Sequence, residues 1–220
     1  MKDISRLIDS TLLKAETTQT QIHDLCVEAA REHFKTVCIN PCWVSYAASL
    51  LKGTDTGVCT VIGFPLGAMT PAAKAFEAKQ AILDGADEID MVLNIGRLKG
   101  GDDSYVRDEI HLVKEACGER TLKVILECCL LTDEEKERAC RLSVEAGADF
   151  VKTSTGFSTH GATLEDVKLM KRVVGDKCHV KAAGGVRDYH TLVAMVEAGA
   201  DRIGTSNGRA LVDGAKQAGN

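Results

Sequence analysis

The sequence predicts a single α/β domain of the (β/α)8 TIM barrel class, in which eight parallel strands alternate with helices. One pattern occurs three times: a helix tail, then Gly-Ala-Asp, then an apolar strand, in segments 82–94, 143–155 and 195–207. The glycine suits the left-handed residue that ends a helix, and the apolar run after it predicts a strand buried on both faces. Regular alternation of strands and helices predicts parallel pairing with right-handed crossovers.

Helix start signals place the elements along the chain. Thr70-Pro71 predicts an N-cap followed by proline, Thr132 with Glu135 forms a capping box, and Thr163 and Asp188 begin two further helices. The expected strands cover residues 6–12, 36–40, 57–63, 88–94, 121–127, 150–155, 179–184 and 202–206. The expected helices cover residues 18–33, 43–52, 71–84, 103–117, 133–146, 163–174, 189–198 and 207–216.

Eight such units without a linker or a composition break predict one barrel domain over residues 1–220. The alternative is an open doubly wound sheet. No G-x-G-x-x-G follows the first expected strand, so the glycine fingerprint of dinucleotide-binding sheets is missing. The barrel is therefore the preferred fold.

Composition excludes several classes of partner. The net charge of −5, the scattered basic residues and an aromatic content of 4% argue against nucleic acid binding. No stretch reaches the ~18 apolar residues of a membrane span, and the N-terminus does not resemble a signal peptide. Nine cysteines without Cys-x-x-Cys spacing argue against disulfides and against a zinc site. We therefore expect a cytoplasmic protein with reduced thiols, no metal and no membrane partner.

Polar residues inside or just after the strands mark the candidate active site, because barrel enzymes place it at the carboxyl ends of the strands. Asp90, Lys152 and Lys181 each interrupt an apolar strand, where an unpaired charge would be costly. The other candidates on this criterion are Asp9, Cys38, Glu127, Ser206 and Asn207.

Two lysines in neighbouring strands indicate Schiff-base chemistry. A second ammonium and desolvation both lower the pKa of a buried lysine, which makes its amine a nucleophile toward carbonyl groups. The alternative is a structural ion pair between Asp90 and a lysine. Lys123 begins its strand, so we expect it at the bottom of the barrel in a structural role. Asp9 either orients substrate hydroxyls or caps a turn, and Cys38 is either a reactive thiol or a small buried side chain.

Glycine-rich loops follow the seventh and eighth strands. Gly184 and Gly185 come after the seventh strand, and Gly204 with Ser206 lie at the end of the eighth, before a helix. In many barrels these two loops bind phosphate, because glycine lets backbone N–H groups approach the phosphate oxygens. The sequence therefore predicts an anion site in this part of the barrel.

With these residues placed, the sequence resembles the deoxyribose-phosphate aldolase family of class I aldolases. The resemblance runs nearly end to end. It is carried by IDSTLLK (8–14), VCINP (37–41), VIGFPLG (61–67), EIDMVLNIG (88–96), LKVILE (122–127), DFVKTSTGF (149–157), VKAAGGVR (180–187) and RIGTSNG (202–208).

The resemblance implies a lyase that reversibly cleaves 2-deoxy-D-ribose 5-phosphate to D-glyceraldehyde 3-phosphate and acetaldehyde, without a cofactor. It implies Lys152 as the Schiff-base lysine, Lys181 as a second lysine and Asp90 as a proton relay. Phe157 stands where some members have lysine. The expected substrate-binding and phosphate-binding residues are Asp9, Cys38, Thr155, Gly156, Gly184, Gly185, Gly204, Ser206 and Asn207.

Two other functions remain open on the sequence. One is a Schiff-base aldolase or transaldolase that acts on a different phosphosugar, and the other is a non-catalytic barrel that binds a phosphosugar. In each case the expected partner is a small phosphosugar. We also expect a homodimer or a higher homo-oligomer, because barrels often associate through their helices.

Overall fold

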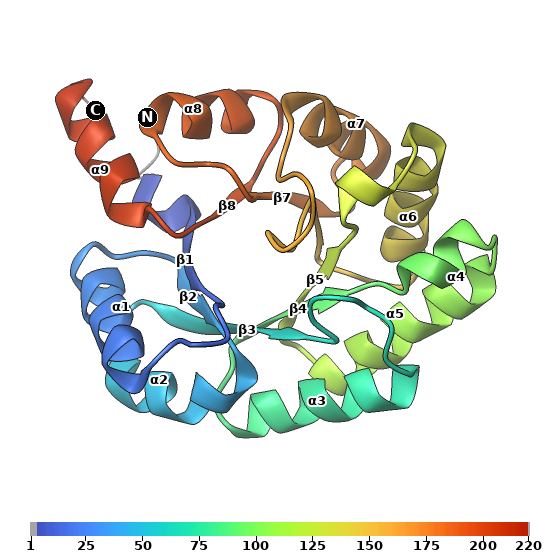
Figure 1. Ribbon diagram of the computed structural model, residues 1–220, viewed down its shortest axis with the longest axis horizontal. Coiled ribbons are helices and arrows are strands. Elements are labelled where there is room, and N and C mark those ends of the chain that lie inside the picture. The colour runs from blue at the N-terminus through green and yellow to red at the C-terminus, as the bar shows by residue number, and fades with distance from the viewer. Residues whose placement is uncertain (1–3, 220) are drawn as a thin grey trace.

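The computed structural model describes residues 4–219, and its eight strands form a closed barrel of parallel neighbours in chain order (Figure 1). The barrel closes where Ile8 of the first strand pairs with Ile203 of the last. The predicted (β/α)8 fold is confirmed. The strands are β1 (Ile8–Leu12), β2 (Thr36–Ile39), β3 (Gly57–Ile62), β4 (Glu88–Val92), β5 (Thr121–Ile125), β6 (Phe150–Lys152), β7 (His179–Ala183) and β8 (Arg202–Thr205).

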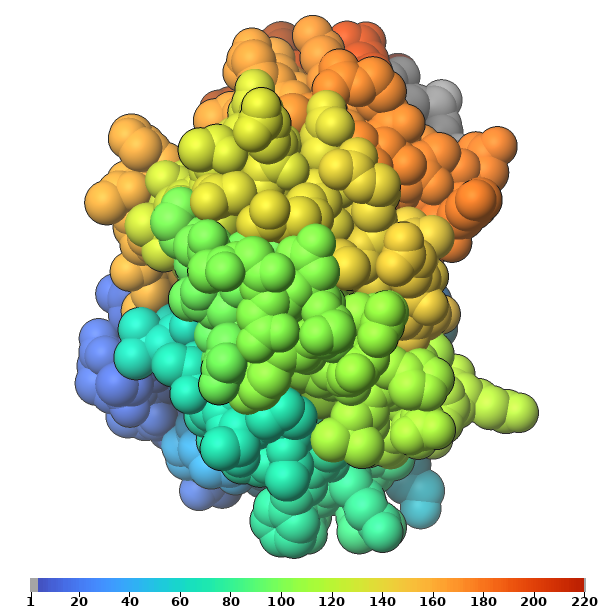
Figure 2. Space-filling view, turned by 90° about the vertical axis from the view of Figure 1, so that its right-hand side faces the viewer, coloured from blue at the N-terminus to red at the C-terminus, as the bar shows by residue number. Residues whose placement is uncertain are grey.

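Helices surround the barrel and cover its outer face. Figure 2 shows one side of this layer, where the green and yellow residues of three successive helices, α4 to α6, lie against one another. Among residues 4–219, no helix combines the length and apolar character needed to cross a membrane. The helices are α1 (Gln19–Arg31), α2 (Val44–Leu51), α3 (Pro71–Leu83), α4 (Ile95–Lys99), α5 (Asp103–Cys117), α6 (Asp133–Glu145), α7 (Leu164–Val174), α8 (Tyr189–Glu197) and α9 (Gly208–Gln217).

The predicted helix caps are present. The Thr70 hydroxyl accepts a hydrogen bond from the backbone of α3, and Thr132 forms a capping box with Glu135 at α6. Thr163 and Asp188 cap α7 and α8 in the same way. These caps satisfy N–H groups that have no partner within the helix. They fix where each helix begins relative to the strand before it.

All eight strands are shorter than predicted, β6 by three residues, β1, β4 and β5 by two, and the others by one. Residues Ile4–Leu7 form a 3-10 turn, so β1 begins at Ile8. Strand β4 ends at Val92, because the Asn94 side chain accepts from the backbone N–H of Arg97 and begins the unpredicted helix α4. Strand β6 ends at Lys152, where the Thr153 hydroxyl bonds to the backbone of β7. In the last two cases a side chain competes with the strand ladder for backbone groups.

A buried ion pair lies outside the barrel, between α3 and α5. Lys74 Nζ is 2.9 Å from Glu109 Oε1, and both side chains are fully buried. The ammonium also donates to the carbonyls of Gly67 and Val92, at 2.8 Å each, and Glu109 accepts from the N–H of Asn94. This pair therefore ties the β3–α3 loop to the carboxyl end of β4.

Burial lowers the pKa of Lys74 and raises that of Glu109, although each charge favours the other. Lys74→Met would leave the buried charge of Glu109 without a cation and would remove the ammonium donor from two carbonyls. We expect it to lower the free energy of unfolding by about 3–5 kcal/mol.

Urea denaturation would measure this loss. The control is the double variant Lys74→Met/Glu109→Leu, which removes both charges and should recover part of the stability. Equal stabilities of the single variant and the unmodified protein would contradict this assignment.

Candidate active site

Strands β4, β6 and β7 bring together, inside the barrel, the three charged residues that interrupt apolar strands. Lys152 is the last residue of β6 and is paired in register with Lys181 of β7. Asp90 of β4 and Lys181 are 0% exposed, and Lys152 is 2% exposed. Residues that are 62 and 91 positions apart in the chain therefore meet at hydrogen-bonding distance.

Asp90 accepts hydrogen bonds from three ammonium groups. Lys123 donates to Oδ1 at 2.8 Å, whereas Lys152 and Lys181 both donate to Oδ2, at 2.8 and 2.9 Å. Burial alone would raise the pKa of Asp90, but these three positive charges outweigh burial and hold that pKa well below its usual value. Asp90 is therefore a carboxylate at neutral pH.

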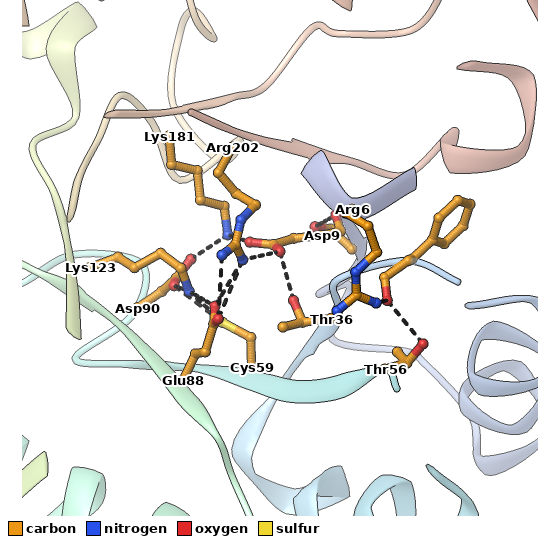
Figure 3. Close-up of polar contacts among 12 residues, drawn as sticks. Arg6, Asp9, Thr36, Thr56, Cys59, Glu88, Asp90, Lys123, Lys181 and Arg202 are labelled. Atoms are coloured by element: carbon orange, nitrogen blue, oxygen red, sulfur yellow. Dashed lines mark hydrogen bonds and ion pairs between the residues drawn. The ribbon is translucent and has the colours of Figure 1, made fainter. Parts of the chain in front are cut away.

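A second set of ion pairs continues from Asp90 across the barrel interior to Asp9, Arg202 and Glu88 (Figure 3). Lys181 contacts Asp9 at 2.5 Å, and Arg202 contacts Asp9 at 2.8 Å and Glu88 at 3.0 Å. Glu88 also lies 2.6 Å from the ammonium of Lys123. Burial alone would lower the pKa of Lys181, but Asp9 and Asp90 raise it far above its ordinary value. Lys181 therefore keeps its proton.

The charges of this interior network can be counted. Asp9, Glu88 and Asp90 carry three negative charges, and Lys123, Lys181 and Arg202 carry three positive charges. The network is neutral without Lys152. Lys152 is thus the cation that the network does not require.

The structure places Lys123 and Asp9 in the interior network. Lys123 is fully buried within the barrel and contacts Asp90, so it belongs to the same network as the other two lysines. Asp9 does not cap a turn, because its carboxylate accepts from Arg202, Lys181 and the Thr36 hydroxyl. Both residues support the floor of the site. Whether Asp9 also orients a substrate stays a prediction.

A cavity of about 350 Å³ opens above this network. Of the sequence candidates, its lining includes Lys152, Thr155, Gly156, Gly184, Gly185, Gly204 and Ser206. Asp9, Cys38, Asp90 and Lys181 are buried beneath it, and Asn207 does not line it. The glycine loops after β7 and β8 therefore do form walls of the cavity that Lys152 faces.

Two basic residues of the cavity were missed in the sequence. Lys14 follows β1 and Arg187 follows the glycine pair after β7, and both are exposed at the cavity wall. Their position in strand–helix loops was the available signal, because such loops form the active face of a barrel. A larger apolar cavity of about 460 Å³ lies elsewhere, lined by Ile4, Leu192 and Gly199 among others. It contains none of the interior lysines.

Among the described residues, one group offers ligand atoms close enough for a metal ion: Cys38, Cys59 and Asp90, whose ligand atoms lie within 4.8 Å of one another. The Asp90 carboxylate is already shared by three ammonium groups, and these would repel a metal cation. The Cys59 thiol donates to Asp90 Oδ1 at 3.1 Å and accepts from Lys123. A hydrogen bond with Cys59 lowers the pKa of Cys38 to about 7. The geometry therefore suits organic catalysis by lysine.

Comparison with known proteins agrees with this geometry. Residues 6–214 match the model of a family described as DeoC/LacD family aldolase. A deoxyribose-phosphate aldolase of Streptococcus uberis is 61% identical over 211 residues, which cover 96% of each chain. A protein of the same name from Brevibacillus brevis is 59% identical over 217 residues, 99% of this chain and 98% of the relative.

Solved structures of similar fold and sequence carry the same name. The structure of a putative deoxyribose-phosphate aldolase from Coccidioides immitis has a TM-score of 0.96 and 43% identity, over 97% of this chain and 86% of that one. A deoxyribose phosphate aldolase from Aeropyrum pernix, described as a unique tetramer, has a TM-score of 0.89 and 32% identity, over 98% and 92% of the two chains. With its barrel, its interior lysines and these relatives, the chain belongs to the DeoC/LacD family of aldolases.

Proposed function

We propose that this protein is a deoxyribose-phosphate aldolase, which reversibly cleaves 2-deoxy-D-ribose 5-phosphate to D-glyceraldehyde 3-phosphate and acetaldehyde. The single observation that carries the proposal is the position of Lys152. It is the one lysine of the described interior network that lines the cavity, and the charges of that network balance without it. The names of relatives that share about 60% of the sequence support the substrate.

Lys152 acts as the nucleophile. Its neutral amine attacks C1 of the open-chain sugar aldehyde, water leaves, and an iminium forms. Loss of the proton from the C3 hydroxyl then breaks the C2–C3 bond, and its electron pair moves to the iminium to give an enamine. C3 becomes the aldehyde of glyceraldehyde 3-phosphate. Protonation of the enamine at C2 and hydrolysis release acetaldehyde and free Lys152.

Asp90 and Lys181 move the protons in this sequence. Asp90 is ionised and lies 2.8 Å from Lys152 Nζ, so it can accept a proton near the reacting carbons, directly or through water. Lys181 keeps its proton and donates to the same oxygen of Asp90.

The phosphate lies against the loops after β7 and β8. Gly184, Gly185, Gly204 and Ser206 line that part of the cavity and offer backbone N–H groups and a hydroxyl. Lys14 and Arg187 supply positive charge to the same cavity. The Phe157 position, which is lysine in some members of the family, therefore need not carry the cation.

A homo-oligomer in the cytoplasm completes the proposal. Helix α3 and the loop before it expose Leu66, Met69, Phe76 and Leu83, which are 74%, 42%, 72% and 73% exposed. Large exposed apolar side chains of this kind mark interfaces between proteins. The Aeropyrum pernix relative is a tetramer. All nine cysteines are free thiols, which suits a reducing compartment.

Lys152→Leu tests the nucleophile. We expect the turnover of deoxyribose 5-phosphate to fall by roughly 10³-fold or more, since the covalent route is lost. The melting temperature should stay the same or rise, because the remaining three acids and three cations balance. Borohydride reduction with acetaldehyde should label Lys152 in the unmodified protein, as read by peptide mass mapping.

The matched control is Lys123→Leu, which removes another of the three lysine side chains that donate to Asp90. It leaves Glu88 and Asp90 one cation short, so we expect a loss of about 3–5 kcal/mol in the free energy of unfolding. A labelled residue other than Lys152, or turnover that survives Lys152→Leu, would disprove the mechanism. Faster cleavage of a different phosphosugar would disprove the substrate.

Arg187→Met and Lys14→Met test the anion site. For each we expect roughly a tenfold rise in KM for deoxyribose 5-phosphate, the size of one lost charge-assisted hydrogen bond. The value of kcat/KM for unphosphorylated deoxyribose should not change, because that sugar presents no anion. An equal effect on both sugars would show that these cations do not bind the phosphate.

Phe76→Asp tests the oligomer. We expect the molar mass from light scattering to fall to that of the 23.6 kDa chain, because a charge on the α3 face opposes burial of that face in an interface. Arg107→Asp on α5, an exposed position on another face, is the control and should leave the mass unchanged. A monomeric unmodified protein would contradict the proposal.

A further inference from the structure

Glu127 follows β5 in a backbone conformation that side chains other than glycine rarely adopt. Its φ is 57° and its ψ is 62°, in the left-handed region. The other described residue of this kind, apart from glycines, is His33, which is exposed, whereas Glu127 is 2% exposed. Backbone strain of this kind persists where the surrounding structure enforces it, often beside a functional site.

The strain arises from a bulge between β5 and β6. The N–H of Leu126 donates to the carbonyl of Lys152, and the N–H of Cys128 donates to that of Thr153, at 2.9 Å each. Two steps along the chain after β5 therefore match one step after β6, and Glu127 is the extra residue. A bulge redirects a side chain. Here the redirected carboxylate reaches the loop that follows Lys152.

The carboxylate of Glu127 holds Thr155. Oε1 accepts from the N–H of Thr155 at 3.2 Å, and Oε2 accepts from the Thr155 hydroxyl in a short hydrogen bond. No ion pair forms between Glu127 and a cation among residues 4–219. A strained backbone and a buried carboxylate without a cation are two costs at one residue. The contacts that Glu127 makes in return are the two hydrogen bonds from Thr155 and a longer one from the Cys129 thiol.

Thr155 connects Glu127 to the cavity wall. Its hydroxyl accepts from the N–H of Phe157 at 3.0 Å, so residues 155–157 form a tight turn. Thr155, Gly156 and Phe157 all line the cavity that contains Lys152. The ring of Phe157 then packs edge-on against Phe64, with 5.3 Å between centroids.

We propose that Glu127 is a positioning residue, which sets the Thr155–Phe157 wall and thereby the affinity for the part of the substrate beyond C2. Glu127 does not touch the reacting atoms, since Thr155 lies between its carboxylate and the cavity. The inference rests on the proposed aldolase function. The inference predicts that Glu127 affects the binding of the whole sugar phosphate. It predicts no effect on the attack of Lys152 on a two-carbon aldehyde, which is too short to reach the wall.

Glu127→Gln tests the inference at nearly constant side-chain volume. We expect KM for deoxyribose 5-phosphate to rise by roughly tenfold, because a charge-assisted hydrogen bond is lost. We expect kcat to change by less than about threefold, and borohydride trapping of Lys152 with acetaldehyde to change by less than about twofold. Trapping also reports folding, because it requires an assembled Lys152 site.

Thr155→Val and the double variant test the path through Thr155. Thr155→Val removes the hydroxyl and should raise KM by a similar factor. In the double variant Glu127→Gln/Thr155→Val, KM should rise no further than in either single variant, because both changes break the same contact. Multiplied KM effects would show that Glu127 acts by another route.

Glycine and alanine variants of Glu127 separate the effect of the backbone conformation from that of the carboxylate. Glu127→Gly relieves the left-handed strain and Glu127→Ala keeps it, so the glycine variant should melt at the higher temperature although both raise KM. His33→Gly relieves strain at the other left-handed residue and should leave kcat and KM unchanged. Equal melting temperatures of the two Glu127 variants would contradict strain at this bulge.

The outcomes distinguish the inference from the function it rests on. If the unmodified protein gives no trapped adduct at Lys152, the aldolase proposal fails and this inference fails with it. If the adduct forms and Glu127→Gln leaves KM unchanged, only the role of Glu127 is overturned. A large fall in kcat at constant KM would also overturn it, because it would place Glu127 in the proton transfers.

Discussion

The carboxylate of Asp90 is the constraint on which the interior of this barrel depends. It accepts from three ammonium groups, on β5, β6 and β7, in a region with almost no exposed surface. Each of these charges would be costly to bury alone, so each needs a partner from another strand. The ion pairs extend through Asp9 to β1 and through Arg202 to β8. Charge and barrel closure are therefore coupled, and the floor of the cavity is held by side chains from six strands.

Within this network the cations are not equivalent. Lys123 contacts Glu88 and Asp90, Lys181 contacts Asp9 and Asp90, and Arg202 contacts Asp9 and Glu88. Lys152 contacts only Asp90, from the end of its strand. Its amine can leave that contact without exposing a carboxylate that has no other cation. The residue that is least needed for charge neutrality is thus the one that is free to form a covalent bond.

The sequence predicted those features that depend on neighbouring residues in the chain. Asp90, Lys152 and Lys181 each break an apolar run, and the glycine after each helix marks the next strand, so fold and reactive residues were accessible. Glu88 and Arg202 were not, because their contact depends on the register of strands 114 residues apart in the chain. Nothing in Leu-Glu-Cys-Cys marks Glu127 as left-handed. That conformation is imposed by a neighbouring strand and by Thr155, 28 residues further on.

The floor and the wall of the cavity are held by different interactions. Substitutions in the floor therefore affect the chemistry at Lys152, whereas substitutions in the wall affect which substrate binds. The floor is a balanced set of charges on the strands, where a substitution changes protonation or stability. One part of the wall is the loop after β6, whose Phe157 packs against Phe64 of the β3–α3 loop, outside that set of charges. One loop is anchored by Lys74 through the carbonyl of Gly67, and the other by Glu127 through Thr155. Because each anchor is a buried polar contact behind the wall, the exposed ring of Phe157 can be exchanged for another side chain without disturbing Lys152. The cations of the cavity then come from Lys14 and Arg187, on other loops.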